Sequence, residues 1–158
     1  MALLKSLQCE RPNVAEFGGF LGHTSLALAQ AIPVGTLTIA EYDTDAPERA
    51  QAITDRLLAA NLPDTLSWRV LHSDALTVIG QLADESLDFA YLDDDHTPQH
   101  VAAEIDALLP KMRPNSLITG HDCFGVCELH KVFTAKGGYA LDLPKLGPAG
   151  GLGIIQVR

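Results

Sequence analysis

The sequence of 158 residues has few cysteines, few basic residues and no long hydrophobic run. Its three cysteines, Cys9 alone and Cys123 and Cys127 four residues apart, do not suit a disulfide framework, so we expect free thiols in a reducing compartment. No apolar run approaches the roughly 20 residues that cross a bilayer, and residues 1–11 have no apolar core of signal-peptide length. We therefore expect a soluble, cytoplasmic protein with no membrane partner.

Basic residues are outnumbered: 11 Lys and Arg stand against 20 Asp and Glu, for a net charge of −9. Domains that bind phosphate backbones usually carry a clustered basic surface, so we expect no nucleic-acid partner. The chain also lacks internal repeats, low-complexity tracts and an obvious linker. A hydrophobic content of 47% is enough to fill one core, which predicts a single domain over residues 1–158.

From residue 13 onward, apolar runs of strand length alternate with stretches of helical spacing, a pattern typical of a parallel sheet with helices on both faces. The predicted strands are residues 14–17, 36–42, 66–72, 87–92, 116–120, 139–143 and 151–157. The predicted helices are residues 24–31, 47–60, 97–112 and, with a weaker pattern, 123–135. In the third helix, Glu104 and Asp106 are predicted to face water. We expect a doubly wound, mostly parallel, seven-stranded Rossmann-like α/β sheet.

Acidic residues or glycines follow each of the first five predicted strands. Ligands of an open parallel sheet bind beyond the carboxyl ends of its strands. The segments found there are Gly18 to Gly22, Glu41-Tyr42-Asp43, Ser73-Asp74-Ala75, Asp93-Asp94-Asp95-His96 and Gly120-His121-Asp122. Glycines in the first segment let the backbone approach a ligand, and free N–H groups at the start of the next helix can bind it. The sequence therefore predicts a small-molecule site at this edge.

Taken in order, these strand ends resemble a class I methyltransferase that uses S-adenosylmethionine, and they are most similar to small O-methyltransferases of the catechol and macrocin type. The resemblance runs from about residue 13 to residue 156. Glu16-Phe17-Gly18 with Gly22 matches the first motif of that family, which surrounds the methionine part of the cofactor. Phe20 stands where many class I enzymes have a glycine, and the catechol-type group often has an aromatic residue there.

The resemblance implies roles for the next two strand ends. Glu41 would accept hydrogen bonds from both ribose hydroxyls, as a carboxylate can, and the adjacent Tyr42 is a further cofactor-binding candidate. Asp74 would meet the adenine amino group, and the backbone N–H of Ala75 a ring nitrogen. Simpler interpretations stay open, since Glu41 can be a solvated strand-end acid and Asp74 can cap the following helix.

The resemblance also implies the chemistry of methyl transfer. Residues in the places of Asp93, His121 and Asp122 hold a divalent cation in the resembling families, and a residue in the place of His96 removes the proton of the acceptor. Asp93 and His96 are thus the predicted catalytic residues. The family commonly has Asp or Glu where this chain has His121, and magnesium prefers oxygen ligands, so magnesium, manganese, zinc or no metal all stay open.

The acidic run before His96 has a plainer interpretation as a solvated helix N-terminus, with Asp95 as the cap and Asp94 on the surface. Three adjacent acids repel one another unless a cation or ligand is near. His121 can likewise be a histidine bonded to Asp93, which would leave His96 as the only base in a metal-free enzyme.

We expect an S-adenosylmethionine-dependent methyltransferase acting on a hydroxyl oxygen of a small-molecule acceptor. The alternatives are an NAD-binding Rossmann oxidoreductase, whose GxGxxG spacing the glycines do not give, and a non-catalytic nucleoside-binding domain. A nucleic-acid or protein methyltransferase is disfavoured by the acidic charge, and the Asn-Pro-Pro-aromatic motif of many base-amine enzymes is absent. Only about a dozen residues precede the first strand, so residues 123–130, a loop at 145–153 or the second subunit of a homodimer would wall the acceptor pocket. A small, open pocket is the alternative.

Overall fold

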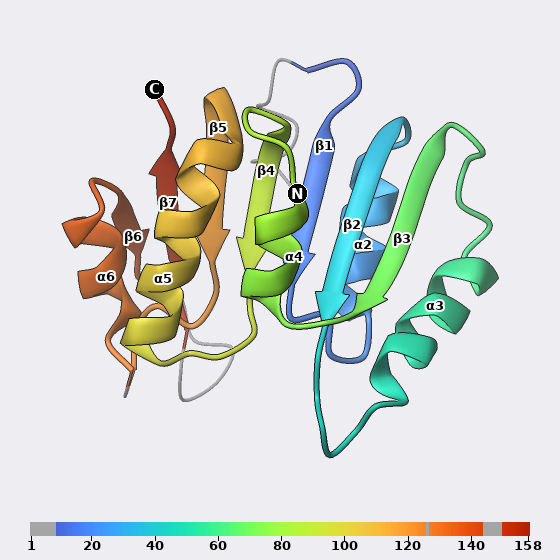
Figure 1. Cartoon of the computed structure of the whole chain (residues 1–158), viewed down its shortest axis with the longest axis horizontal. Coiled ribbons are helices and arrows are strands. Elements are labelled where there is room, and N and C mark those ends of the chain that lie inside the picture. The colour runs from blue at the N-terminus through green and yellow to red at the C-terminus, as the bar shows by residue number, and fades with distance from the viewer. Residues whose placement is uncertain (1–8, 126, 144–149) are drawn as a thin grey trace.

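A computed structural model describes residues 9–125, 127–143 and 150–158 of the chain. These residues form a seven-stranded sheet of order β3-β2-β1-β4-β5-β7-β6 (Figure 1). The strands are β1 (Asn13–Phe17), β2 (Gly35–Glu41), β3 (Leu66–His72), β4 (Leu87–Leu92), β5 (Met112–Gly120), β6 (Tyr139–Leu141) and β7 (Leu152–Gln156). The α-helices are α2 (His23–Ala31), α3 (Arg49–Ala59), α4 (Ala75–Gln81), α5 (Pro98–Leu108) and α6 (Leu129–Ala135).

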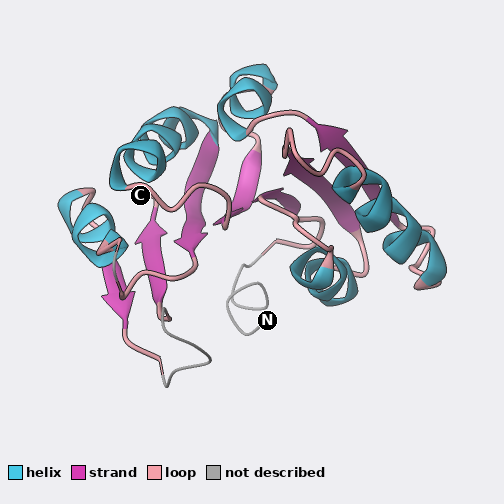
Figure 2. Ribbon diagram, turned by 90° about the horizontal axis from the view of Figure 1, so that it is seen from below, coloured by secondary structure: helices cyan, strands magenta, loops and turns pink. Residues whose placement is uncertain are grey.

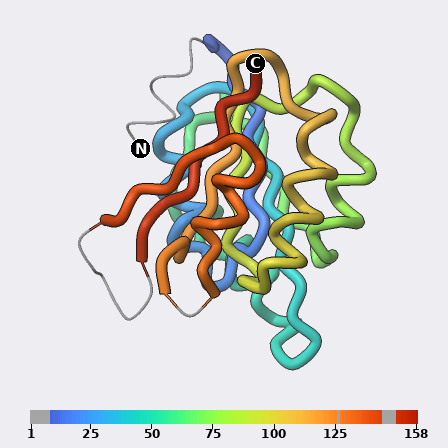
Figure 3. Tube along the Cα trace, turned by 90° about the vertical axis from the view of Figure 1, so that its left-hand side faces the viewer, coloured from blue at the N-terminus to red at the C-terminus, as the bar shows by residue number. Residues whose placement is uncertain are grey.

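The first five strands of the chain pair in parallel, and β7 pairs antiparallel with both β5 and β6. The antiparallel strands form the edge that faces the viewer in Figure 3. β1 lies between β2 and β4, and the chain moves outward from β1 in one direction and then from β4 in the other. The strand order therefore reverses between β1 and β4, where ligands of such sheets bind.

Helices cover both faces of the sheet, as predicted (Figure 2). Residues alternate between the two faces along a strand, so that Val14 packs with α2 and α3 while Ala15 packs with α4, α5 and α6. Leu28 and Ile53 belong to the first of these two apolar clusters, and Ile105 to the second. The sheet is thus buried on both sides, and the loops at the carboxyl ends of its strands are left to form a site.

The predicted helix at residues 123–135 is wrong in its first half. Among its described residues only Leu129–Ala135 are helical, because Gly125 has a positive φ of 137° and Phe124 forms an antiparallel bridge with Gly150 instead. The bridge brings the start of this segment against the chain near β7. Most of the predicted loop at 145–153 lies outside the described residues.

Two observed boundaries, the end of α5 and the start of β5, also differ from the predicted ones. The helix ends at Leu108, and a 3₁₀ turn (Leu109–Lys111) leads directly into β5. That strand begins at Met112 instead of residue 116, because Met112 pairs with Leu87 of β4 across a bulge. The other predicted strands and helices match the observed ones to within two residues. Helix α4 was not predicted.

The prediction that Glu104 faces water is wrong, whereas its neighbour Asp106 is exposed as expected. Glu104 is 0% exposed because α5 packs between α4 and α6, so that a helix face polar in the sequence is covered. Among the helices of the described residues, none is both long and apolar enough to cross a membrane.

Candidate functional site

A cavity of about 390 Å³ opens beyond the carboxyl ends of β1, β2, β3 and β4. Its volume lies within the range of small-molecule sites. The predicted cofactor residues that line it are Gly18, Glu41, Tyr42, Asp74 and Ala75. Two other predicted cofactor residues, Glu16 and Gly22, are not among the lining residues. Four of the five predicted strand ends thus meet at one cavity, at the switch point of the sheet.

The turn after β1 lies tightly against the end of β4. Gly18 has a φ of 92°, and a Cβ placed on it would collide with the backbone carbonyl of Asp93. Gly22 is also left-handed, with a φ of 76°, and is the N-cap residue of α2. Both positions therefore need glycine for the path of the backbone.

Phe20 adopts a left-handed φ of 49°, which costs little for glycine and is uncommon for other residues. Its N–H donates a hydrogen bond of 2.6 Å to Oε2 of Glu41. The Arg49 guanidinium lies 4.5 Å from the centroid of the Phe20 ring, and Arg49 also forms an ion pair with Asp43. These contacts hold a half-exposed aromatic ring at the rim of the cavity.

Glu41 is buried at the end of β2, and one of its oxygens already holds the Phe20 N–H. That bond leaves Oε1 as the carboxylate oxygen that can receive a ligand. The next residue, Tyr42, is 56% exposed and tilts its ring against His72 with centroids 5.5 Å apart. A polar acceptor and an aromatic face therefore lie side by side on this wall of the cavity.

Asp74 caps α4, which is the simpler of its two interpretations. Its Oδ1 accepts a hydrogen bond of 2.9 Å from the backbone N–H of Thr77. Hydrogen bonding from the Thr77 side chain, and then from its backbone N–H, holds the pKa of Asp74 below its ordinary value. Contact between Asp74 and adenine stays a prediction. It would use the lone pairs of the carboxylate that the Thr77 hydrogen bond leaves free.

Glu16 lies in the middle of the sheet, fully buried, where Ser25 of α2 donates its hydroxyl hydrogen bond to Oε2. Its other oxygen has no hydrogen-bond partner among residues 9–125, 127–143 and 150–158. Burial raises the pKa of Glu16 to about 8, against the opposing effect of the Ser25 hydrogen bond. The structure thus places Glu16 behind the turn of Gly18, and contact with a cofactor stays a prediction.

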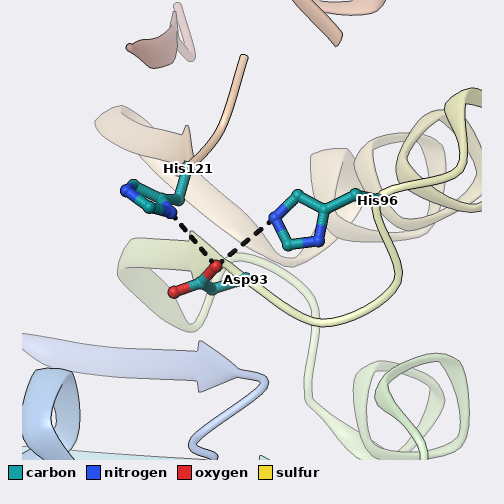
Figure 4. Close-up of side chains that lie close together, drawn as sticks. All are labelled: Asp93, His96 and His121. Atoms are coloured by element: carbon teal, nitrogen blue, oxygen red, sulfur yellow. Dashed lines mark ion pairs between the residues drawn. The ribbon is translucent and has the colours of Figure 1, made fainter. Parts of the chain in front are cut away.

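Asp93, which lines the cavity, comes together with His96 and His121, which do not (Figure 4). His96 Nε2 and His121 Nδ1 each lie 3.4 Å from Oδ1 of Asp93. Asp93 follows β4, His121 follows β5, and His96 stands in the loop before α5, where its Nδ1 is 3.0 Å from the Asp94 carbonyl oxygen. The hydrogen bond to Asp93 raises the pKa of His96 above its ordinary value, against the effect of burial.

The group that the structure brings together differs by one residue from the predicted metal ligands. Ligand atoms of Asp93, His96 and His121 lie within 4.8 Å of one another. Asp122 adopts a left-handed φ of 49° and places Oδ1 3.1 Å from His121 Nδ1. Asp122 therefore contacts His121, while His96, predicted as a base, joins the ligand-like group.

A second group was missed from the sequence: Asp94, His100 and Glu104. His100 Nε2 lies 3.1 Å from Oδ2 of Asp94 and 3.7 Å from Oε1 of Glu104. Asp94 is partly buried, against its plainer interpretation as a surface residue, and the sequence pattern gave His100 no predicted role. The usable signal was the spacing of His100 and Glu104, four residues apart and so on one helix face. Thr97 caps α5, and Asp95 Oδ1 instead accepts a hydrogen bond from the Thr97 N–H.

Residues 15–123 match the model of a protein family described as a methyltransferase domain. The chain belongs to this methyltransferase family. The matched segment contains the whole cavity and both groups of close side chains, and it ends just after β5. The NAD-binding oxidoreductase alternative is thereby set aside. No curated protein sequence matches the chain.

Solved structures of O-methyltransferases share the fold of this methyltransferase domain. The enzyme from Bacillus cereus in complex with SAH is 20% identical, with a TM-score of 0.72 over 94% of this chain and 75% of that one. TomG from Streptomyces achromogenes, involved in tomaymycin synthesis and in complex with SAM, is 19% identical, with a TM-score of 0.73 over 99% and 76%. A Klebsiella pneumoniae protein provisionally named an O-methyltransferase is 20% identical, with a TM-score of 0.77 over 99% and 77%. The predicted fold and family are confirmed.

Proposed function

We propose that this chain transfers a methyl group from S-adenosylmethionine to a hydroxyl oxygen of a small-molecule acceptor. The observation that carries the proposal is the position of Asp93. It lines the cavity that also contains Glu41 and Asp74, and it contacts both His96 and His121. A cofactor at the switch point and an acceptor beside the histidines would therefore be neighbours. Family membership and the SAH and SAM complexes of two structural neighbours support the cofactor.

The cofactor would lie across the carboxyl ends of β1 to β4. Glu41 Oε1 would accept hydrogen bonds from the ribose hydroxyls, and the Tyr42 ring would pack against the nucleoside. Asp74 and the backbone N–H of Ala75 would meet the adenine edge. The glycine turn at Gly18 would border the methionine end, with Glu16 and Gly22 supporting that turn from behind.

His96 would act as the general base. Its Nε2 would take the proton of the acceptor hydroxyl while the oxygen forms a bond to the methyl carbon. The bond from that carbon to the sulfonium sulfur would break, leaving S-adenosylhomocysteine. The Asp94 carbonyl, 3.0 Å from Nδ1, would orient the neutral imidazole with its lone pair on Nε2. Asp93 would stabilise the protonated form, consistent with the raised pKa of His96.

A divalent cation is compatible with the donors at this end of the cavity. Two carboxylates with one imidazole suit zinc or manganese better than magnesium. His96 cannot bind a cation through Nε2 and remove a proton with it, so Asp93, His121 and Asp122 are the ligands we propose. A bound cation would lower the pKa of the acceptor hydroxyl. A cytoplasmic location, a homodimer and the lack of nucleic-acid or membrane partners stay predictions from composition and chain length.

Calorimetric titration with S-adenosylhomocysteine, with and without manganese or zinc, tests the proposal. We expect roughly micromolar binding, weakened about tenfold in Glu41→Gln, because loss of a charged acceptor costs on the order of 1.4 kcal/mol. Asp106→Asn removes one charge on an exposed helix position and is the matched control. Absence of binding by the folded, ligand-free protein would contradict the proposal. Binding without turnover on any phenol or sugar alcohol, with and without added metal, would instead favour the non-catalytic nucleoside-binding alternative.

A further inference from the structure

The group of Asp94, His100 and Glu104 has no part in the proposed methyl transfer. Asp94 belongs to the loop after β4, whereas His100 and Glu104 lie one turn apart on α5. Asp94 and His100 are partly exposed and line the cavity, and Glu104 closes the group from behind at 0% exposure. The group is therefore open to solvent on one side only.

Glu104 is the unusual member. Neither of its carboxylate oxygens has a hydrogen-bond partner in the described part of the chain, and Oδ1 of Asp94 is likewise buried without one. A buried carboxylate without a partner is strongly unfavourable unless a proton or a cation compensates it. Burial, and then the negative charge of Asp94, raise the pKa of Glu104 to about 9. The side chain is directed toward His100 Nε2, which lies 3.7 Å from Oε1.

The distances suit a small divalent cation. Donor atoms around a tetrahedral zinc ion lie about 3.4 Å apart, given bonds of about 2.1 Å. The two distances from His100 Nε2 are 3.1 Å to Asp94 and 3.7 Å to Glu104, on either side of that value. Two carboxylates with one imidazole are ligands that zinc accepts, and the cavity side leaves room for water as the fourth.

We propose that Asp94, His100 and Glu104 form a binding site for a divalent transition-metal cation, zinc in the first instance, separate from the methyl-transfer group. The cation would connect the loop after β4 to α5. Asp93 and His96 stand in or beside that loop, so the site would fix the backbone that carries the proposed base. It would be structural, and it would neutralise carboxylates that otherwise repel one another.

Equilibrium dialysis of the purified protein against zinc, followed by metal analysis, measures the number of ions bound without any cofactor. We expect Glu104→Gln to bind one zinc ion fewer than the wild type. This difference does not depend on how many ions bind at Asp93, His96 and His121. Glutamine keeps the size of the side chain and removes its charge. Asp106→Asn, an equal charge change on the exposed face of α5, should bind as many ions as the wild type.

A second measurement isolates the site. In a His96→Ala/His121→Ala variant, which lacks two donors of the other group, calorimetry should still detect one zinc ion, and zinc should raise the melting temperature. Adding Glu104→Gln should weaken that binding at least roughly tenfold, since even outer-shell changes have effects of that size.

Equal zinc content in wild type and Glu104→Gln would overturn the proposal. So would a His96→Ala/His121→Ala variant that folds and binds no zinc. In that case a proton shared between Glu104 and Asp94 would be the compensation. Neither result depends on methyl transfer, so failure of this site and failure of the proposed function are distinguishable.

Discussion

Asp93 and Asp94 are adjacent in the sequence, yet their carboxylates belong to two different groups of side chains. Asp93 contacts His96 and His121, which come from loops after β4 and β5. Asp94 contacts His100 of α5, in front of the buried Glu104. The first group consists of partly exposed residues throughout, whereas the second ends in a carboxylate that solvent does not reach.

The difference in burial separates two kinds of chemistry. A base must exchange its proton with an acceptor, so the partly exposed group with His96 suits catalysis. A buried carboxylate without a partner must be compensated permanently, so the group with Glu104 suits a bound cation or a bound proton. Similar residue types therefore support different functions a few ångströms apart.

Replacing His96 tests whether the group around Asp93 is catalytic, and it has the largest expected effect. We expect His96→Gln to lower turnover by about 10²- to 10⁴-fold, because a general base contributes on that order. Binding of S-adenosylhomocysteine should stay within about twofold of wild type, since the glutamine does not touch the proposed cofactor residues. Initial-rate kinetics and calorimetry measure the two quantities. Full activity on the true acceptor would exclude His96 as the base.

Glu16 shows what burial does to a carboxylate. It is as buried as Glu104, but it has Ser25 as a hydrogen-bond partner. Its pKa is about 8 in the folded protein and near 4.5 unfolded, so the folded state holds an extra proton between these values. Stability from this group is therefore fully present below about pH 4.5 and is lost as pH rises toward 8. The Glu16→Gln variant does not lose this stability as pH rises, because glutamine does not titrate.

We expect the free energy of unfolding of Glu16→Gln to improve relative to wild type by about 2.5 kcal/mol between pH 5 and pH 7. Urea unfolding at a series of pH values measures the difference. The matched variant Ser25→Ala removes the partner that lowers the pKa of Glu16, so the loss of stability should continue to higher pH. Parallel stability curves for wild type and Glu16→Gln would show that Glu16 is ionised in the folded state.

The architecture was predictable because its signals are local. Alternating apolar runs placed the strands, and strand-end residues such as Gly18, Glu41 and Asp93 then had to meet at one edge, which the cavity confirms. The resemblance of these strand ends to class I methyltransferases also indicated the family. Local composition and topology together were sufficient for the fold and for the position of the site.

The second group was not predictable by the same route. Glu104 lies on a helix face whose polar residues predict exposure to solvent. The packing of α5 between α4 and α6 covers that face. The loop at Phe124 was misjudged for a related reason, since its bridge to Gly150 depends on a distant part of the chain. Contacts between elements decided both features, and single-element patterns do not contain them.

Asp74, another acid at this edge, caps α4 and gives the smallest expected effect. Asp74→Ala should lower the free energy of unfolding by about 1 kcal/mol, because the Thr77 N–H loses its acceptor. Asp74→Asn should stay within a few tenths of a kcal/mol, since asparagine caps equally well. Urea unfolding and S-adenosylhomocysteine titration of both variants separate cap from ligand. If Asp74→Asn binds as wild type while Asp74→Ala binds weakly, one oxygen acceptor serves the adenine. If both bind as wild type, Asp74 acts only as a cap, and unlike the groups of Asp93 and Asp94 it has no ligand.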